Sequence, residues 1–203
     1  MWRLLRPLRY FALHNREKSL IDLLGTIVLG ALILTPFLLV PEASFFREGG
    51  FLDRLIGLMS ALTGFFVAAL VAAATFAHPD LDREMTIGAV RMKNPNGPGW
   101  VNLTRRELAC AIFGYLAFAA LAFSVAASIV VPIATAAPPL PGFVSVELAT
   151  FLADHRASVR AVGMAIAIAP LAHIMTATGL GIYYLMERLH HRAPVIVSRN
   201  EAA

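Results

Sequence analysis

Charged residues are scarce in this sequence, and cysteine is almost absent. Only 15% of its 203 residues are charged, whereas 58% are hydrophobic and the mean hydropathy is +0.70. Soluble domains carry about 25% charged and about 45–50% apolar residues, so this composition excludes an ordinary soluble domain. It also excludes a disordered chain, which would be poor in apolar residues. The single cysteine, Cys110, excludes an intrachain disulfide. What remains is an integral membrane protein.

The motifs of well-known enzyme classes are missing as well. The sequence contains no P-loop, GxGxxG, GxSxG or HExxH pattern. No Asp or Glu lies in the middle of a long apolar run, where a carboxylate relay for protons or sodium would need one. No repeat relates the two halves of the chain, as it does in many transporters. We therefore expect a protein that is not an enzyme and that has no cofactor and no metal.

Four long apolar runs dominate the chain. A membrane-spanning helix needs about 20 predominantly apolar residues, and such runs occupy residues 20–40, 55–77, 108–131 and 159–186. Pro41, Pro79 and Pro132 predict the ends of the first three. The sequence thus predicts an all-α integral membrane protein with four transmembrane helices in one domain, residues 20–186. The first run is longer than the 7–15 apolar residues of a signal peptide, so we expect an anchor rather than a cleaved signal.

Lysine and arginine are distributed unequally between the two sides of the predicted bundle. Five lie in residues 1–19, five in loop 78–107 and three in tail 187–203, which makes thirteen, against four in the remaining segments. The positive-inside rule then places both termini and loop 78–107 in the cytoplasm, with loop 132–158 outside. We expect a multi-pass protein of a bacterial inner membrane. The net charge of +4 follows from this topology and indicates no nucleic-acid partner.

The N-terminal residues 1–19 predict a basic amphipathic arm on the membrane surface. An α-helical spacing separates a basic arc from an apolar arc, a pattern typical of helices that lie in the headgroup layer. The basic arc holds Arg3, Arg6, Arg9 and His14, and the apolar arc holds Leu4, Leu5, Leu8, Phe11 and Ala12. Pro7 predicts the start of this helix or a kink in it.

Loop 78–107 predicts a small cytoplasmic β-hairpin. Two strand-like stretches, residues 85–92 and 100–103, flank a turn-rich segment. Thr104 and Glu107 form a capping-box pattern at the start of the third helix. An isolated hairpin is marginally stable, so it should pack on the bundle, on a second copy or on a partner; a loop without fixed strands is the alternative. The candidate docking residues are Trp100, Arg91, Lys93, Arg105 and Arg106.

Small residues recur at intervals of four in the apolar runs. Such rows allow neighbouring helices to approach closely. The fourth run carries Ala161, Ala165, Ala169, Ala177 and Gly181, and the second carries Ser60, Gly64 and Ala68. These rows predict close helix packing, either within one chain or between the copies of a homo-oligomer.

His173 interrupts the row of the fourth run. An ionisable residue inside a membrane span marks a candidate functional site and should face protein or water. Thr63 and Ser124 lie at similar predicted depth and are its candidate partners. One interpretation is a proton relay, gate or pore lining; the other is a neutral side chain that hydrogen-bonds between helices and only stabilises packing.

Two classes of function fit these features best. The leading hypothesis is an oligomeric membrane sensor or adaptor that signals to or recruits a cytoplasmic protein. In architecture, though not in any motif, the chain resembles small four-span membrane subunits of prokaryotic antiviral systems, and this resemblance implies a multi-gene setting. The alternative is a small channel or transporter whose pathway passes His173. A membrane enzyme of unrecognised type is a third, weaker hypothesis.

Overall fold

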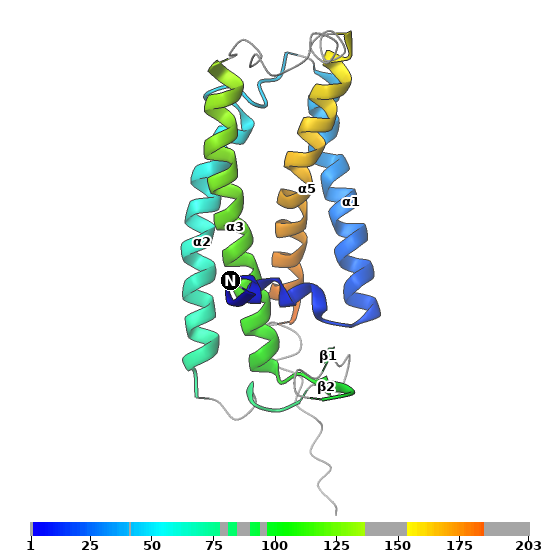
Figure 1. Ribbon diagram of the computed structural model, residues 1–203, viewed down its shortest axis with the longest axis vertical. Coiled ribbons are helices and arrows are strands. Elements are labelled where there is room, and N and C mark those ends of the chain that lie inside the picture. The colour runs from blue at the N-terminus through cyan, green and yellow to red at the C-terminus, as the bar shows by residue number, and fades with distance from the viewer. Residues whose placement is uncertain are drawn as a thin grey trace, which may run out of the picture.

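Four long helices run side by side in the computed structural model (Figure 1). The structure describes residues 2–40, 42–77, 81–84, 90–93, 97–136 and 154–184. The long helices are α1 (Arg16–Leu39), α2 (Phe51–Thr75), α3 (Arg105–Ala136) and α5 (Arg156–Tyr183). Within the described ranges, these four are long and apolar enough to cross a membrane, which confirms the predicted spans and fits a multi-pass membrane protein.

The helices associate as two pairs. α2 packs along α3, α1 packs along α5, and contacts between α3 and α5 join the pairs. Buried side chains such as Met59 and Phe66 on α2, and Leu116 on α3, form the interior. By contrast, Leu23, Leu32 and Leu39 of α1 are more than half exposed. Large exposed aliphatic side chains along a helix are suited to contact with lipid tails.

The α1–α5 pair depends on glycine for its close approach. A Cβ atom added to Gly25 would lie 2.6 Å from the Cγ2 atom of Thr176, which is too close for any real pair of carbon atoms. One turn further along, a Cβ atom on Gly30 would lie 3.7 Å from the Cβ atom of Ala172. Gly25 and Gly30 therefore let α1 lie against α5. On α5, the contacting residues Ala172 and Thr176 lie next to the predicted row of small residues, not in it.

The structure divides the predicted small-residue rows. On α5, Ala177 and Gly181 are buried, and a Cβ atom added to Gly181 would lie 3.0 Å from the Cγ2 atom of Ile112 on α3. The rest of that row is half-buried or exposed, and so is the row on α2; these residues are Ala161, Ala165, Ala169, Ser60, Gly64 and Ala68. Within the described part of one chain, only the C-terminal end of the α5 row packs closely against another helix.

The third helix does not end at Pro132, as the sequence predicted. α3 continues through this proline to Ala136. A proline inside a helix removes one backbone hydrogen bond, and apolar helices tolerate this loss when neighbouring groups satisfy the freed atoms. Near the end of the helix, the Thr135 hydroxyl lies 3.0 Å from the carbonyl oxygens of Val131 and Pro132. Much of the predicted outer loop, including residues 137–153, lies outside the described residues.

The N-terminal arm forms a 3-10 helix, η1 (Trp2–Ala12), that lies across the bundle against α3 (Figure 1). A 3-10 helix has three residues per turn, so Pro7, Tyr10 and Leu13 lie in one row; Pro7 is half-buried, and Tyr10 and Leu13 are buried. Phe11, from the predicted apolar arc, is 61% exposed. The arm thus contacts the bundle through a different row of side chains than an α-helical spacing predicts.

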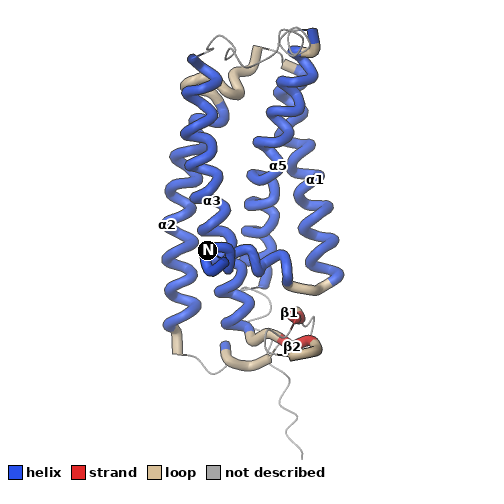
Figure 2. Tube along the Cα trace, viewed as in Figure 1, coloured by secondary structure: helices blue, strands red, loops and turns tan. Residues whose placement is uncertain are grey.

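A two-stranded sheet in the segment that connects α2 to α3 confirms that a hairpin forms there (Figure 2). Its first strand begins later than the predicted stretch 85–92, of which residues 85–89 lie outside the described residues. β1 (Arg91–Lys93) pairs antiparallel with β2 (Trp100–Asn102), and Lys93 lies opposite Trp100. The capping box is confirmed too, because the Thr104 N–H donates to Glu107 at 3.0 Å and the Glu107 N–H donates to the Thr104 hydroxyl at 3.2 Å. The hairpin therefore leads directly into the first turn of α3.

Candidate functional site

A buried ion pair lies near the start of α1. The helix begins after Asn15, whose side-chain oxygen accepts hydrogen bonds from the backbone N–H groups of Glu17 and Lys18. This start places Lys18 and Asp22 one turn apart on the same face. The Lys18 ammonium group donates to Asp22 Oδ2 at 2.7 Å, and Lys18 is only 3% exposed. A buried charge needs a partner of opposite sign, and Asp22 supplies it.

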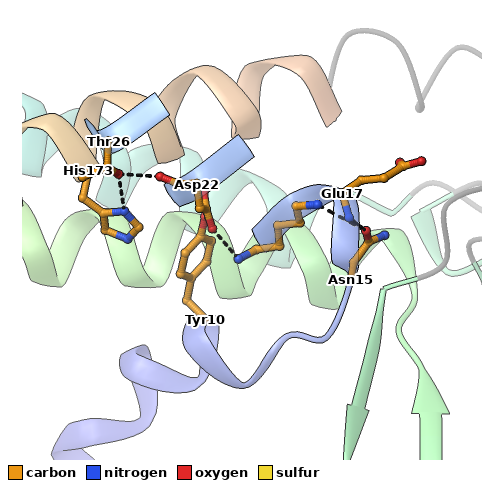
Figure 3. Close-up of polar contacts among 7 residues, drawn as sticks. Tyr10, Asn15, Glu17, Asp22, Thr26 and His173 are labelled. Atoms are coloured by element: carbon orange, nitrogen blue, oxygen red, sulfur yellow. Dashed lines mark hydrogen bonds and ion pairs between the residues drawn. The ribbon is translucent and has the colours of Figure 1, made fainter. Parts of the chain in front are cut away.

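Tyr10 of the arm covers this ion pair (Figure 3). Its hydroxyl group lies 2.9 Å and 2.8 Å from the two carboxylate oxygens of Asp22, to which it donates its hydrogen. The Lys18 ammonium group lies 3.6 Å from the centre of the Tyr10 ring, in a cation–π contact. Burial raises the pKa of Tyr10, and the nearby Asp22 charge and hydrogen bond raise it further. The phenol therefore stays protonated and remains a hydrogen-bond donor.

His173 of α5 joins the same cluster through α1 (Figure 3). Its Nδ1 atom lies 3.2 Å from the Thr26 hydroxyl oxygen, which itself lies 2.6 Å from the Asp22 carbonyl oxygen. A hydroxyl has a single hydrogen, and the short contact to the carbonyl uses it. We infer that Nδ1 carries the imidazole proton and donates to Thr26. In the neutral ring, Nε2 is then an acceptor; it is buried and has no hydrogen-bond partner among the residues that the structure describes.

Aromatic rings from two elements, η1 and α3, surround His173. The Tyr10 ring stacks on Tyr115 of α3 with 4.5 Å between centroids, and Phe11 stacks on His173 with 5.5 Å between centroids. Tyr115 also meets His173 edge to face, at 5.5 Å. Each such contact contributes about 0.5–1.5 kcal/mol beyond the burial of area. The arm, α3 and α5 are thus joined by rings, while α1 and α5 are joined by a hydrogen bond. We call Tyr10, Lys18, Asp22, Thr26, Tyr115 and His173 the arm cluster.

The structure does not bring together the three polar residues singled out in the sequence. His173 pairs with Thr26 rather than with Thr63 or Ser124. The Thr63 hydroxyl donates to the Met59 carbonyl in its own helix, at 2.8 Å. Ser124 is instead part of the α2–α3 contact, where its hydroxyl lies 3.5 Å from that of Ser60. Sequence reasoning missed Tyr10, Asp22 and Thr26, although the i, i+4 spacing of Lys18, Asp22 and Thr26 was a visible signal.

The arm also reaches the hairpin. The His14 N–H donates to the Arg91 carbonyl at 2.8 Å, and the Arg91 N–H donates back at 3.2 Å. The arm thereby adds a single residue pair to the edge of β1. The His14 ring lies 5.2 Å from the Trp100 ring, between centroids. A small apolar layer of Leu13, Val90 and Leu103, each under 5% exposed, lies beneath this junction. The hairpin is therefore held in place by a third segment.

The outer face of the hairpin is basic and aromatic. Side chains alternate between the two faces of a strand. Val90 and Leu103 are buried on one face, so Arg91 and Lys93, with Trp100 opposite Lys93, belong to the other. Arg91 and Lys93 are exposed, and Trp100 is 56% exposed. Of the five candidate docking residues, these three lie together on one exposed surface, which we call the hairpin face.

The other two candidate docking residues bond to neighbouring parts of the chain: Arg106 to the end of α2, and Arg105 to the connecting loop. Arg106 forms a two-point ion pair with Asp82, at 2.7 Å and 3.2 Å, and also donates to the carbonyl oxygens of Ala73 and Ala74 at the end of α2. Through its hydrogen bond, Arg106 lowers the pKa of Asp82. The backbone N–H of Arg105 donates to the Arg83 carbonyl at 3.3 Å. Arg106 thus stabilises the junction of α2 and α3.

The chemistry that this arrangement permits is binding and mechanical coupling. Over the described stretches of chain, no three His, Cys, Asp or Glu side chains gather where they could hold a metal ion. Residues 10–14 connect the two, because Tyr10 bonds to Asp22 in the arm cluster and His14 pairs with Arg91 of the hairpin. Comparison of the chain with protein-family models, curated proteins and solved structures finds no match.

Proposed function

We propose that this chain is a non-enzymatic membrane adaptor of a bacterial inner membrane, which presents the hairpin face to a cytoplasmic protein. The observation that carries this proposal is the exposure of Trp100, at 56%, on a hairpin that the N-terminal arm fixes to the bundle. A fixed surface loses less conformational entropy on binding than a mobile loop does. Exposed tryptophan and arginine are frequent anchors of protein interfaces.

The hairpin face favours an acidic partner. Arg91 and Lys93 of β1 bring two positive charges beside Trp100. The other residue of β2 on this face, Asn102, is neutral. Complementary charge accelerates encounter and selects between partners, while a buried aromatic side chain supplies most of the affinity. The expected partner therefore presents carboxylates around an apolar pocket.

The arm supplies the signalling part of the proposal. Tyr10 lies in the arm cluster and His14 lies beside the hairpin, so binding at the hairpin face and packing around His173 favour the same position of the arm. Thermodynamic coupling is reciprocal: whatever releases Tyr10 from Asp22 should weaken binding at the hairpin face. A homo-oligomer fits this proposal, because the exposed small-residue rows on α2 and α5 suit contact with a second copy.

The proposal is tested by substitution on the two faces of β2. The partner is first identified by affinity purification of the full-length protein from its own host's membranes, and its Kd is then measured with purified components. We expect Trp100→Ala to weaken binding by about 2 kcal/mol or more, the usual effect of losing a central aromatic anchor. Val101→Ala, on the opposite face of the same strand, is the matched control and should change the Kd little.

Two outcomes would contradict this function. If Trp100→Ala and Val101→Ala change the Kd equally, the hairpin face is not the docking surface. If the purified protein has a fixed copy number that Trp100→Ala reduces, the face binds a second copy rather than a cytoplasmic partner. Native mass spectrometry of the purified protein reports this copy number directly.

A further inference from the structure

A cavity of about 650 Å³ opens at the end of the bundle opposite the hairpin. Its walls come from residues 42–47, which follow α1, and from the first residues of α5. These two segments lie side by side at the upper end of the bundle in Figure 1. The lining includes Arg47, Arg156, Arg160, Glu42, Phe45 and Phe46. The cavity takes no part in the arm cluster or the hairpin face.

Positive charge predominates in this cavity. Three arginines face one carboxylate, so the lining carries a formal charge of +2. Arg160 donates to the Ala43 carbonyl at 2.9 Å and so connects the loop to α5, while Arg47 and Arg156 are exposed. The guanidinium group is planar and offers paired N–H donors that match the oxygens of a phosphate group. Several arginines converging on one cavity therefore suit a phosphate-bearing anion.

The other border of the cavity is apolar. Phe46 lies against α5, where a Cβ atom added to Gly163 would be 3.5 Å from its ring. Phe45 is buried in an aromatic group with Phe37 and Phe51, with ring centroids 5.0 and 5.6 Å away. Beyond the cavity, the last turn of α1 exposes Leu39 to 75%. A ligand here meets arginines on one side and lipid-facing aliphatic surface on the other.

We propose that this cavity is a binding site for a phosphate group, with the headgroup of an anionic phospholipid as its expected source. An amphiphile satisfies both borders at once: its phosphate accepts from the arginines while its acyl chains lie along the exposed end of α1. Basic pockets between membrane helices on the cytoplasmic side are known to bind lipid headgroups, and we expect the same chemistry at the opposite membrane surface. A free phosphate ion could accept the same hydrogen bonds from the arginines, but it would make no contact with the apolar border. This inference is independent of the proposed function.

The test uses the full-length protein in an uncharged detergent. The Tm is measured against increasing phosphatidylglycerol, phosphatidylcholine or inorganic phosphate, and apparent Kd values are obtained from the Tm shifts. We expect phosphatidylglycerol to raise the Tm of the wild type more than phosphatidylcholine does. The double variant Arg47→Gln with Arg156→Gln should weaken phosphatidylglycerol binding at least about tenfold, because each arginine supplies a charge-assisted hydrogen bond.

The matched control removes the same charge at the other end of the molecule. Arg91→Gln with Lys93→Gln should leave the Kd for phosphatidylglycerol unchanged. Glu42→Gln keeps every cation and removes the one carboxylate of the lining, so it should tighten binding, and it keeps the test open if the double variant fails to fold. If inorganic phosphate raises the Tm and competes with phosphatidylglycerol for binding, the result supports the site and identifies free phosphate as a second ligand. Equal weakening in both double variants, or no Tm shift in the wild type, overturns the proposal.

Discussion

At the level of single residues, the positions of two hydrogen atoms, one on the Thr26 hydroxyl and one on the His173 ring, determine which hydrogen bonds the arm cluster can form. Because the Thr26 hydroxyl donates to the Asp22 carbonyl, His173 donates through Nδ1, and its buried Nε2 atom has no partner in the described part of the chain. A buried unsatisfied acceptor is costly, by about 1–3 kcal/mol. The aromatic contacts with Phe11 and Tyr115 hold the ring in place despite this cost. His173 is thus either a packing residue or a residue that takes up a proton at Nε2.

The substitution His173→Gln separates these two roles. Glutamine can donate to Thr26, and an interhelical hydrogen bond of this kind contributes about 0.6 kcal/mol on average. We expect the variant to assemble normally and to bind its partner slightly more weakly, because glutamine keeps the hydrogen bond but loses the ring contacts with Phe11 and Tyr115. Both proteins are then reconstituted in liposomes, and ion flux is measured from pH 5 to 8. We expect either no flux in both or the same flux in both. A wild-type flux that the variant abolishes would support the channel hypothesis instead, because glutamine cannot titrate.

Tyr10 gives a second prediction at this scale, with a defined sign in pH. Its pKa is raised from the usual value of 10.0, first by burial and then by Asp22. The protonated phenol and its bond therefore stabilise the docked arm fully below pH 10, and this contribution is lost as the pH rises through the raised value. The difference between the wild-type and Tyr10→Phe absorbance titrations at 295 nm isolates Tyr10. We expect ionisation well above pH 10; a midpoint near 10 would mean that the arm is not docked.

Among the elements, the end of α2 and the start of α3 are connected by Arg106. Arg106 lies in the first turn of α3, donates to two carbonyl groups at the end of α2 and binds Asp82 through two nitrogens. The last carbonyl groups of a helix lack partners within it. Arg106 supplies such partners and so fixes the end of α2 to the start of α3.

We expect Arg106→Gln to loosen this junction. Amide hydrogen exchange at residues 73–77 should become about two- to fivefold faster at pH 7, the effect of losing an exposed ion pair. Asp82→Asn is the comparison variant, because it removes the carboxylate and keeps both carbonyl contacts. Since Arg106 lowers the pKa of Asp82 below its usual value of 3.8, the pair contributes fully above pH 3.8, and this contribution is lost as the pH falls through the lowered pKa. Exchange rates that are equal in wild type and Arg106→Gln at pH 7 would contradict this role.

The elements that could be predicted from the sequence are those with a strong local signal. The four helices follow from long apolar runs, and the hairpin follows from its turn residues and the capping box at Thr104. The arm's 3-10 spacing was not predictable, because its contacts with Tyr115 and His173 are made across long sequence separations. The same reason hid Thr26 as the partner of His173, while Pro132 looked like a helix end because proline usually breaks helices in water.

At the scale of the whole molecule, the two ends of the bundle differ in chemistry. One end carries the hairpin, the arm and thus the hairpin face, and the other carries the arginine-lined cavity. The adaptor proposal requires the hairpin end to face the cytoplasm, where a soluble partner can reach Trp100. The lipid proposal requires only that the cavity lies at the opposite membrane surface. Orientation in the membrane is therefore the property on which the adaptor proposal depends most directly.

Reporter fusions test this orientation. With thirteen Lys and Arg residues on the hairpin side against four on the other, fusions at residue 95 and at the C-terminus should remain in the cytoplasm, while fusions at residues 46 and 143 should be exported. Alkaline phosphatase becomes active only after export, and green fluorescent protein fluoresces in the cytoplasm, so the two reporters at each site check one another. Neutralising Arg3, Arg6 and Arg9 together reduces the difference to ten against four, which should leave the orientation unchanged. Phosphatase activity at residue 95 would place the hairpin face outside the cell and rule out a cytoplasmic partner.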